Sequence, residues 1–259
     1  MTAAWTIARL VTTVASLTLI SSCATSGHTA GPAARATGAA PTASPNGSTP
    51  TPLDGCFTRA RGQVETIRDT GGGTLMLGIV GTGPRVVVLS NESDEDLCSW
   101  LPLSARLTAT GYRVVLWDYG GNPAAAELAT VVKTMRSQGA NRVVLMGASE
   151  GAKASLIAGA QIRPAVQGVV SLSAESILNP AIEVVDFVRH LRCPVLFLTA
   201  KQDPYGSAPA GRQFLAAAPT EAKALLTVQG ADHGTALLAG RSAAKTLPAI
   251  LAFMRRELR

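Results

Sequence analysis

A serine in a glycine-flanked turn is the first sign of chemistry in this sequence. Residues 147–151 read Gly-Ala-Ser-Glu-Gly, after an apolar run at 142–146 and before an alanine-rich run. A reactive serine must project from a tight turn with little bulk on either side, and glycines two positions away meet that need. The order of strand, turn and helix therefore predicts that Ser149 is a nucleophile.

Asp203 and His233 also follow apolar runs. Asp203 comes just after residues 194–199, and His233 comes shortly after a run that ends at residue 228. Such runs are typical of strands in a parallel sheet, where ligands bind at the carboxyl ends. A histidine there could take the proton of Ser149, and a carboxylate could hold and stabilise the imidazole. The sequence thus predicts a nucleophile, a base and an acid at one edge of a sheet.

The acid has competitors. Glu175 follows the apolar run at 168–172, and Asp232 is adjacent to His233 in the sequence. Adjacent side chains rarely face one another in a turn, so Asp232 is expected to point elsewhere. Glu175 stays open as an alternative to Asp203 at this point.

Alternating strands and helices must position these residues. Apolar runs predict strands at 74–80, 85–89, 113–117, 142–146, 168–172, 194–199 and 225–228. Helix-length segments lie at 97–110, 124–138, 150–161, 181–191, 208–217 and 241–258. Residues 64–68 and 74–80, joined by three glycines, predict an antiparallel hairpin at one edge. The fold class is therefore α/β, with a mostly parallel central sheet and helices on both faces.

These motifs together resemble the α/β-hydrolase superfamily. The resemblance rests on the turn at 146–151, the acid loop at 201–204, the histidine loop at 231–235 and the segment from 98 to 121, and it covers nearly all of 59–259. The chain order Ser149, Asp203, His233 is the order found in that superfamily. The resemblance favours Asp203 over Glu175, because its loop follows the later strand that most members use.

The resemblance also implies an oxyanion hole. One donor is expected to be the backbone N–H of Glu150, at a helix N-terminus. The other is expected from the loop after residues 85–89, where Asn91 is the candidate. The carboxylate of Glu150 is expected to be an ordinary first-turn residue.

The activity that the resemblance implies is hydrolysis of carboxylic esters, with thioesters or small amides as variants. Some twenty residues separate the strands at 168–172 and 194–199, which leaves room for one helix and no cap domain. An enzyme of the haloalkane or epoxide type would have aspartate in place of Ser149. The alternative is a catalytically silent module with the same fold that serves as a binding or scaffold protein.

The N-terminus reads as an export signal. Residues 1–22 carry a basic start and a short apolar core, and Ile20-Ser21-Ser22-Cys23 resembles a bacterial lipobox. Residues 23–52 are rich in Ala, Thr, Ser, Gly and Pro and predict a disordered tether before a domain at 53–259. We expect a lipoprotein anchored to the membrane through Cys23 outside the cytoplasm; simple secretion is the alternative.

Cysteine usage and charge set further bounds. An exported chain permits a disulfide between Cys56 and Cys98, while Cys193 is expected to be a buried thiol. The net charge of +6 includes no extended basic run, so nucleic acid is not expected as a partner. The sequence has neither metal-ligand spacing nor a nucleotide-binding glycine motif, so no cofactor or metal is expected. Acidic residues at 92–96 are expected to form a solvated loop.

Overall fold

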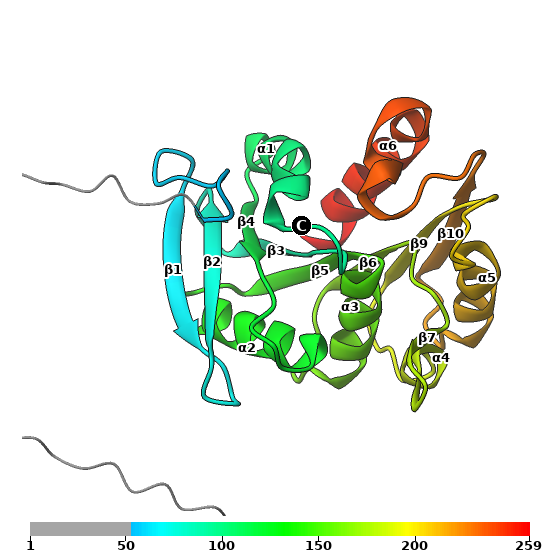
Figure 1. The fold of residues 1–259 in the computed structure, drawn as a ribbon, viewed down its shortest axis with the longest axis horizontal. Helices are drawn as coiled ribbons and strands as arrows, with labels where there is room; N and C mark the ends of the chain where they lie inside the picture. The colour runs from blue at the N-terminus through cyan, green and yellow to red at the C-terminus, as the bar shows by residue number, and fades with distance from the viewer. Residues whose placement is uncertain (1–52) are drawn as a thin grey trace, which may run out of the picture. The chain divides into compact units, whose positions relative to one another are not determined.

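A mixed sheet of eight strands forms the centre of the structure, a computed structural model that describes residues 53–259 (Figure 1). Its strand order is β1-β2-β4-β3-β5-β6-β9-β10. Strand β2 runs antiparallel to β1 and β4, and the remaining pairs are parallel. The predicted mostly parallel sheet and its edge hairpin are confirmed. The predicted signal peptide, lipidated Cys23 and tether lie outside the described residues.

The elements follow the predicted runs closely. The strands of the main sheet are β1 (Gln63–Arg68), β2 (Thr74–Val80), β3 (Arg85–Ser90), β4 (Arg113–Trp117), β5 (Arg142–Ala148), β6 (Gly168–Leu172), β9 (Val195–Ala200) and β10 (Lys223–Val228). The helices are η1 (Leu97–Trp100), α1 (Leu101–Ala109), α2 (Ala124–Ser137), α3 (Glu150–Gln161), α4 (Val184–Val188), α5 (Ser207–Ala217), η2 (Gly234–Leu238) and α6 (Gly240–Glu257). Within the described residues, none of these helices is long and apolar enough to cross a bilayer.

Helices cover both faces of the sheet. Helices α1 and α6 lie over one face, and α2 and α3 lie over the other (Figure 1). Successive strand residues alternate between the two cores: Val86 and Val88 pack with α2 and α3, whereas Val87 and Leu89 pack with α1 and α6. This period of two is the geometry of a pleated strand, and it buries continuous apolar runs on both sides.

The connection from β6 to β9 differs from the prediction. Instead of a helix over 181–191, it contains a hairpin of β7 (Ile177–Asn179) and β8 (Ile182–Glu183), followed by the short α4. The side chain of Asn179 accepts a hydrogen bond from the Ala181 N–H at 2.9 Å. Asn followed by Pro favours such a turn, which shortens the helix. This connection carries no inserted cap domain.

The strand order creates a crevice at the carboxyl ends of the central strands. Strand β3 lies between β4 and β5, and β5 lies between β3 and β6. The chain therefore leaves the sheet in different directions from adjacent strand ends, and a crevice opens where these connections diverge. The residues after β3, β5 and β6 border this crevice.

The first described residues are tied to the sheet. A disulfide joins Cys56 and Cys98 with a Cα–Cα distance of 6.0 Å, the pairing that the sequence permits. Asp54, next to this link, lies beside Asp118, which directly follows β4. Burial, with the neighbouring carboxyl of Asp54 acting in the same direction, raises the pKa of the Asp118 carboxyl to about 8. The free Cys193 is buried, as expected.

Removing the disulfide should weaken the fold. The link spans 42 residues, so a Cys56→Ala/Cys98→Ala variant gains chain entropy when it unfolds. We expect urea denaturation to show a loss of about 2–4 kcal/mol in the free energy of unfolding. Wild-type protein in reductant should shift to a similar midpoint. An unchanged midpoint in both samples would show that the link does not stabilise this domain.

The Asp118 carboxyl should make stability depend on pH. Because its folded pKa of about 8 lies above the ordinary value of 3.8, the folded state keeps a proton that the unfolded state has lost between these pH values. The contribution is thus complete below pH 4 and is lost as the pH rises through 8. Asp118→Asn mimics the protonated group and should gain roughly 2–4 °C in Tm over wild type between pH 5 and pH 8.

Thermal unfolding at both pH values measures this gain. The control is Glu221→Gln, which removes one carboxylate from an exposed position. Its Tm difference from wild type should stay nearly constant between the two pH values. An equally constant difference for Asp118→Asn contradicts the assignment.

Candidate active site

Ser149 occupies a strained turn between β5 and α3. Its backbone has φ 48° and ψ −110°, which residues with a Cβ rarely adopt. A Cβ on Gly147 would overlap the carbonyl of Gly151, and a Cβ on Gly151 would overlap the carbonyl of Ser90. Both glycines are therefore required by close backbone approach. The turn leaves the Ser149 side chain at the carboxyl edge of the sheet.

His233 and Asp203 form a closely joined pair. The Nδ1 of His233 lies 2.8 Å from Oδ2 of Asp203, whose side chain is fully enclosed. The Ser207 hydroxyl donates to the same oxygen, and the Tyr205 N–H donates to Oδ1 at 2.9 Å. Since an ionised carboxylate only accepts, Nδ1 carries the proton and Nε2 presents its lone pair. Asp203 thus has the position of the imidazole-orienting acid.

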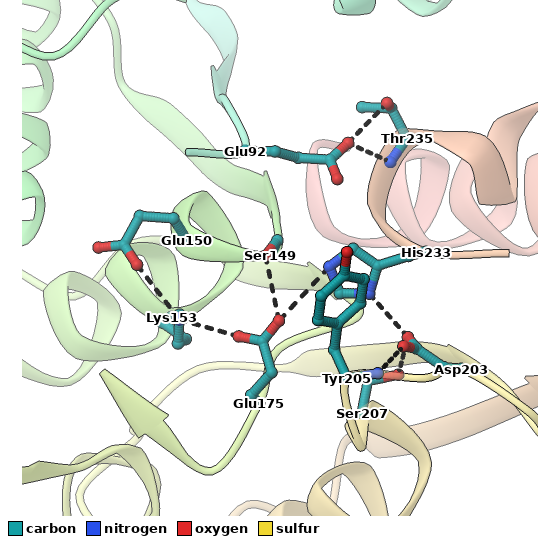
Figure 2. A network of polar contacts seen from close by, with 10 residues as sticks. All are labelled: Glu92, Ser149, Glu150, Lys153, Glu175, Asp203, Tyr205, Ser207, His233 and Thr235. Atoms are coloured by element: carbon teal, nitrogen blue, oxygen red, sulfur yellow. Dashed lines mark hydrogen bonds and ion pairs between the residues drawn. The ribbon is translucent and has the colours of Figure 1, made fainter. Parts of the chain in front are cut away.

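Glu175 stands between Ser149 and His233 (Figure 2). Its Oε1 accepts a hydrogen bond from the Ser149 hydroxyl at 3.1 Å and lies 3.4 Å from Nε2 of His233. In the described part of the chain the serine hydroxyl therefore donates to Glu175 and makes no hydrogen bond to the imidazole. The two candidate acids lie beside different nitrogens of the imidazole ring: Asp203 faces Nδ1, and Glu175 faces Nε2.

Lys153 is a site residue that the sequence analysis missed. Its Nζ lies 2.9 Å from Oε2 of Glu175 and 3.2 Å from Oε2 of Glu150 (Figure 2). Burial acts to lower the pKa of Lys153, but the hydrogen bond and charge of Glu175, with those of Glu150, outweigh it and raise the pKa. The available signal was spacing, because a residue four positions after Ser149 lies on the same side of the helix.

Ser149 and His233 open into a cavity of about 370 Å³. A larger hollow of about 610 Å³ at the start of α6 contains none of the predicted catalytic residues. The smaller cavity is the one near the chemistry. Its lining consists of Ser93, Asp94, Ser149, Lys153, Glu175, Ile177, Tyr205 and His233.

The two predicted oxyanion donors have different surroundings. As the first residue of α3, Glu150 has a backbone N–H without a partner inside the helix, next to the nucleophile. The side-chain amide of Asn91 instead donates to Trp117 O at 3.0 Å and to Asp118. This amide is committed to the end of β4, so the Asn91 side chain does not offer its N–H groups to the cavity. Ser93 in the loop after β3 lines the cavity.

Glu92 and Asp232 both lie outside the His233–Asp203 pair. The expectation of a solvated acidic loop is wrong for Glu92, which is buried and accepts bonds from the N–H and hydroxyl of Thr235, each at 2.7 Å. It ties the loop after β3 to the loop that carries His233 (Figure 2). Asp232 accepts from Ser242 and points away from the pair, as expected.

Comparison with known proteins identifies the fold. No family model and no curated protein matches the sequence. An esterase from Pyrococcus furiosus superposes with a TM-score of 0.65 at 12% identity, covering 76% of this chain and 91% of its own. The esterase domain of a Rhodothermus marinus protein gives 0.64 at 20% identity, covering 76% and 99%. Est1E from Butyrivibrio proteoclasticus gives 0.64 at 16% identity, covering 75% and 98%.

These likenesses, together with the strand order, show that residues 53–259 adopt the α/β-hydrolase fold. At such low identity they establish the fold alone. What the chain does must be argued from its own side chains.

Proposed function

We propose that this protein is a serine hydrolase that cleaves carboxylic esters or related acyl bonds. One observation carries the proposal: Ser149 on its strained turn shares a cavity with His233, whose ring is oriented by the enclosed Asp203. The names of the structural neighbours, which include esterases and a monoacylglycerol lipase, support the same class of reaction.

The reaction follows from these positions. The Ser149 hydroxyl turns from Glu175 to Nε2 of His233, which takes its proton as Oγ attacks the acyl carbon. Asp203 stabilises the imidazolium, and the Glu150 N–H with a backbone donor after β3 stabilises the oxyanion. His233 then protonates the leaving group, and water attacks the acyl-enzyme with His233 as the base. The short β6–β9 connection supports small or extended substrates that reach the site without a lid.

We propose that the enzyme works outside the cytoplasm, held at the membrane by a lipidated Cys23. The disulfide between Cys56 and Cys98 supports an oxidising compartment. The N-terminal sequence is the other support, since its apolar core and lipobox fit a lipoprotein signal.

The second candidate function is a silent binding module. The observation that favours it is Glu175, which receives the Ser149 hydroxyl in place of His233. A reactive serine and an inert one can be told apart chemically.

A fluorophosphonate probe should label the wild-type protein on Ser149. The probe reacts with serines that a neighbouring base activates, so labelling should vanish in Ser149→Ala and after heat denaturation. Gel fluorescence measures the labelling, and circular dichroism confirms that both proteins are folded. A folded wild-type chain that stays unlabelled would favour the silent module.

Asp203→Asn should lower kcat for p-nitrophenyl acetate by about 10⁴-fold, because the amide stabilises the wrong tautomer of His233. Asp232→Asn is the matched control. It removes one negative charge from the adjacent loop position, and its carboxylate contacts Ser242 and not the imidazole. The control should stay within about twofold of wild type. Equal rates for the two variants would remove Asp203 from the mechanism.

A further inference from the structure

The catalytic cavity is acidic, although the chain has a net charge of +6. Asp94 and Glu175 line the cavity. Among the described residues, Lys153 is the only lysine or arginine in its lining. Glu150 shares the same ammonium at 3.2 Å. Two carboxylates thus pair with a single lysine, Asp94 adds a third negative charge to the lining, and the excess is negative. A cleft of one sign attracts ligands of the opposite sign and repels those of its own.

Glu175 holds this charge next to the reacting atoms. Its Oε1 is 3.1 Å from the nucleophilic Oγ of Ser149, while Lys153 binds the other oxygen at 2.9 Å. Lys153 therefore positions the carboxylate with one oxygen toward the place that an acyl carbon must occupy. A substituent on the carbon beside the scissile carbonyl would lie within contact distance of that oxygen.

An exposed aromatic ring completes the mouth of the cavity. Tyr205 is 65% exposed, and its ring centroid lies 4.5 Å from that of His233 (Figure 2). Ile177 also lines the cavity and is 51% exposed. A carboxylate combined with an accessible aromatic face is an arrangement that binds cationic nitrogen, through charge and through the ring quadrupole.

From these contacts we propose that the site selects acyl substrates that carry a positively charged nitrogen on the carbon next to the scissile carbonyl, as in α-aminoacyl esters and amides. The inference rests on the proposed serine hydrolase function. Glu175 binds the cation, Lys153 positions Glu175, and Tyr205 offers its ring face. The nitrogen is not consumed, because the reaction is still transfer of the acyl group to Ser149 and then to water.

Cation binding is coupled to the activation of Ser149. When a substrate ammonium binds Oε1 of Glu175, it competes with the serine hydroxyl for that oxygen. The released hydroxyl can then donate to Nε2 of His233, which is 3.4 Å from the same oxygen. A neutral ester must break the Ser149–Glu175 hydrogen bond without this compensation. The charged group should therefore raise kcat as well as lower KM.

Three p-nitrophenyl esters test the inference on the full chain. The trimethylammonioacetyl and 3,3-dimethylbutanoyl esters have nearly the same shape and differ in charge, and the succinyl ester adds a negative charge. After division by each uncatalysed rate, kcat/KM should fall in the order cationic, neutral, anionic. The kcat/KM of the cationic ester should exceed that of the neutral ester by about tenfold, the ratio that an interaction of about 1.4 kcal/mol gives.

Glu175→Gln should reduce the ratio of cationic to neutral ester to about twofold or less. Asp186→Asn is the matched control, since it removes one carboxylate from an exposed position outside the cavity, and it should keep the wild-type ratio. Because Glu175→Gln also deprives Lys153 of a partner and can fail to fold, the wild-type protein supplies a second readout. Its ratio should shrink between 50 mM and 0.5 M salt, as screening weakens the attraction.

The outcomes separate this inference from the proposed function. If Ser149 labels with the fluorophosphonate and the neutral ester is hydrolysed, but the wild-type ratio is near one, the cation selectivity is refuted and the hydrolase stands. A ratio that persists in folded Glu175→Gln also refutes it. If Ser149 does not label and none of the esters is hydrolysed, the proposed function fails and the inference fails with it.

Discussion

The backbone at Ser149 is the constraint on which the site depends. A φ of 48° with ψ −110° is strained for a residue with a Cβ, so the surroundings must hold it. The Ser149 N–H donates to Leu172 O, and the Gly151 N–H donates to Asn91 O, each at 2.9 Å. These acceptors belong to the end of β6 and to the residue after β3. The turn exists because β5 lies between those two strands, so the sheet order itself maintains the strain.

Two carboxylates, Asp203 and Glu175, lie beside the imidazole of His233, and their different exposure gives them different roles. Asp203 is fully enclosed and bound by Ser207 and a backbone N–H, so its carboxylate is held in place against Nδ1 of His233. Glu175 faces the cavity, and its Oε1 is shared between a hydroxyl and Nε2 of His233. A group in that position can exchange partners when a ligand enters. The same functional group therefore orients the base on one side and meets the substrate on the other.

Much of the fold could be predicted from the sequence, because its signals are local. Buried parallel strands appear as apolar runs, and the turns after them expose the serine, the acid and the histidine at one edge. The prediction failed where local signals compete. A helix was expected over 181–191, but the hydrogen bond from the Ala181 N–H to the Asn179 side chain favours a turn, and a hairpin forms. Glu92 was expected in water because its neighbours are acidic, yet Thr235 provides two donors that make its burial favourable.

The charge of the cavity could not be predicted, because it depends on pairing between distant residues. Lys153 and Glu175 meet only because β5 and β6 are neighbours in register, with Gly147 opposite Ser171. Sequence spacing places Lys153 on the Ser149 side of α3, but it does not show that two carboxylates converge on that ammonium. Composition does not indicate the charge of the cavity either, because the chain is net positive and the site is net negative. A short motif therefore predicts the position of the nucleophile. The substrates that the site accepts depend instead on side chains that only the folded sheet brings together.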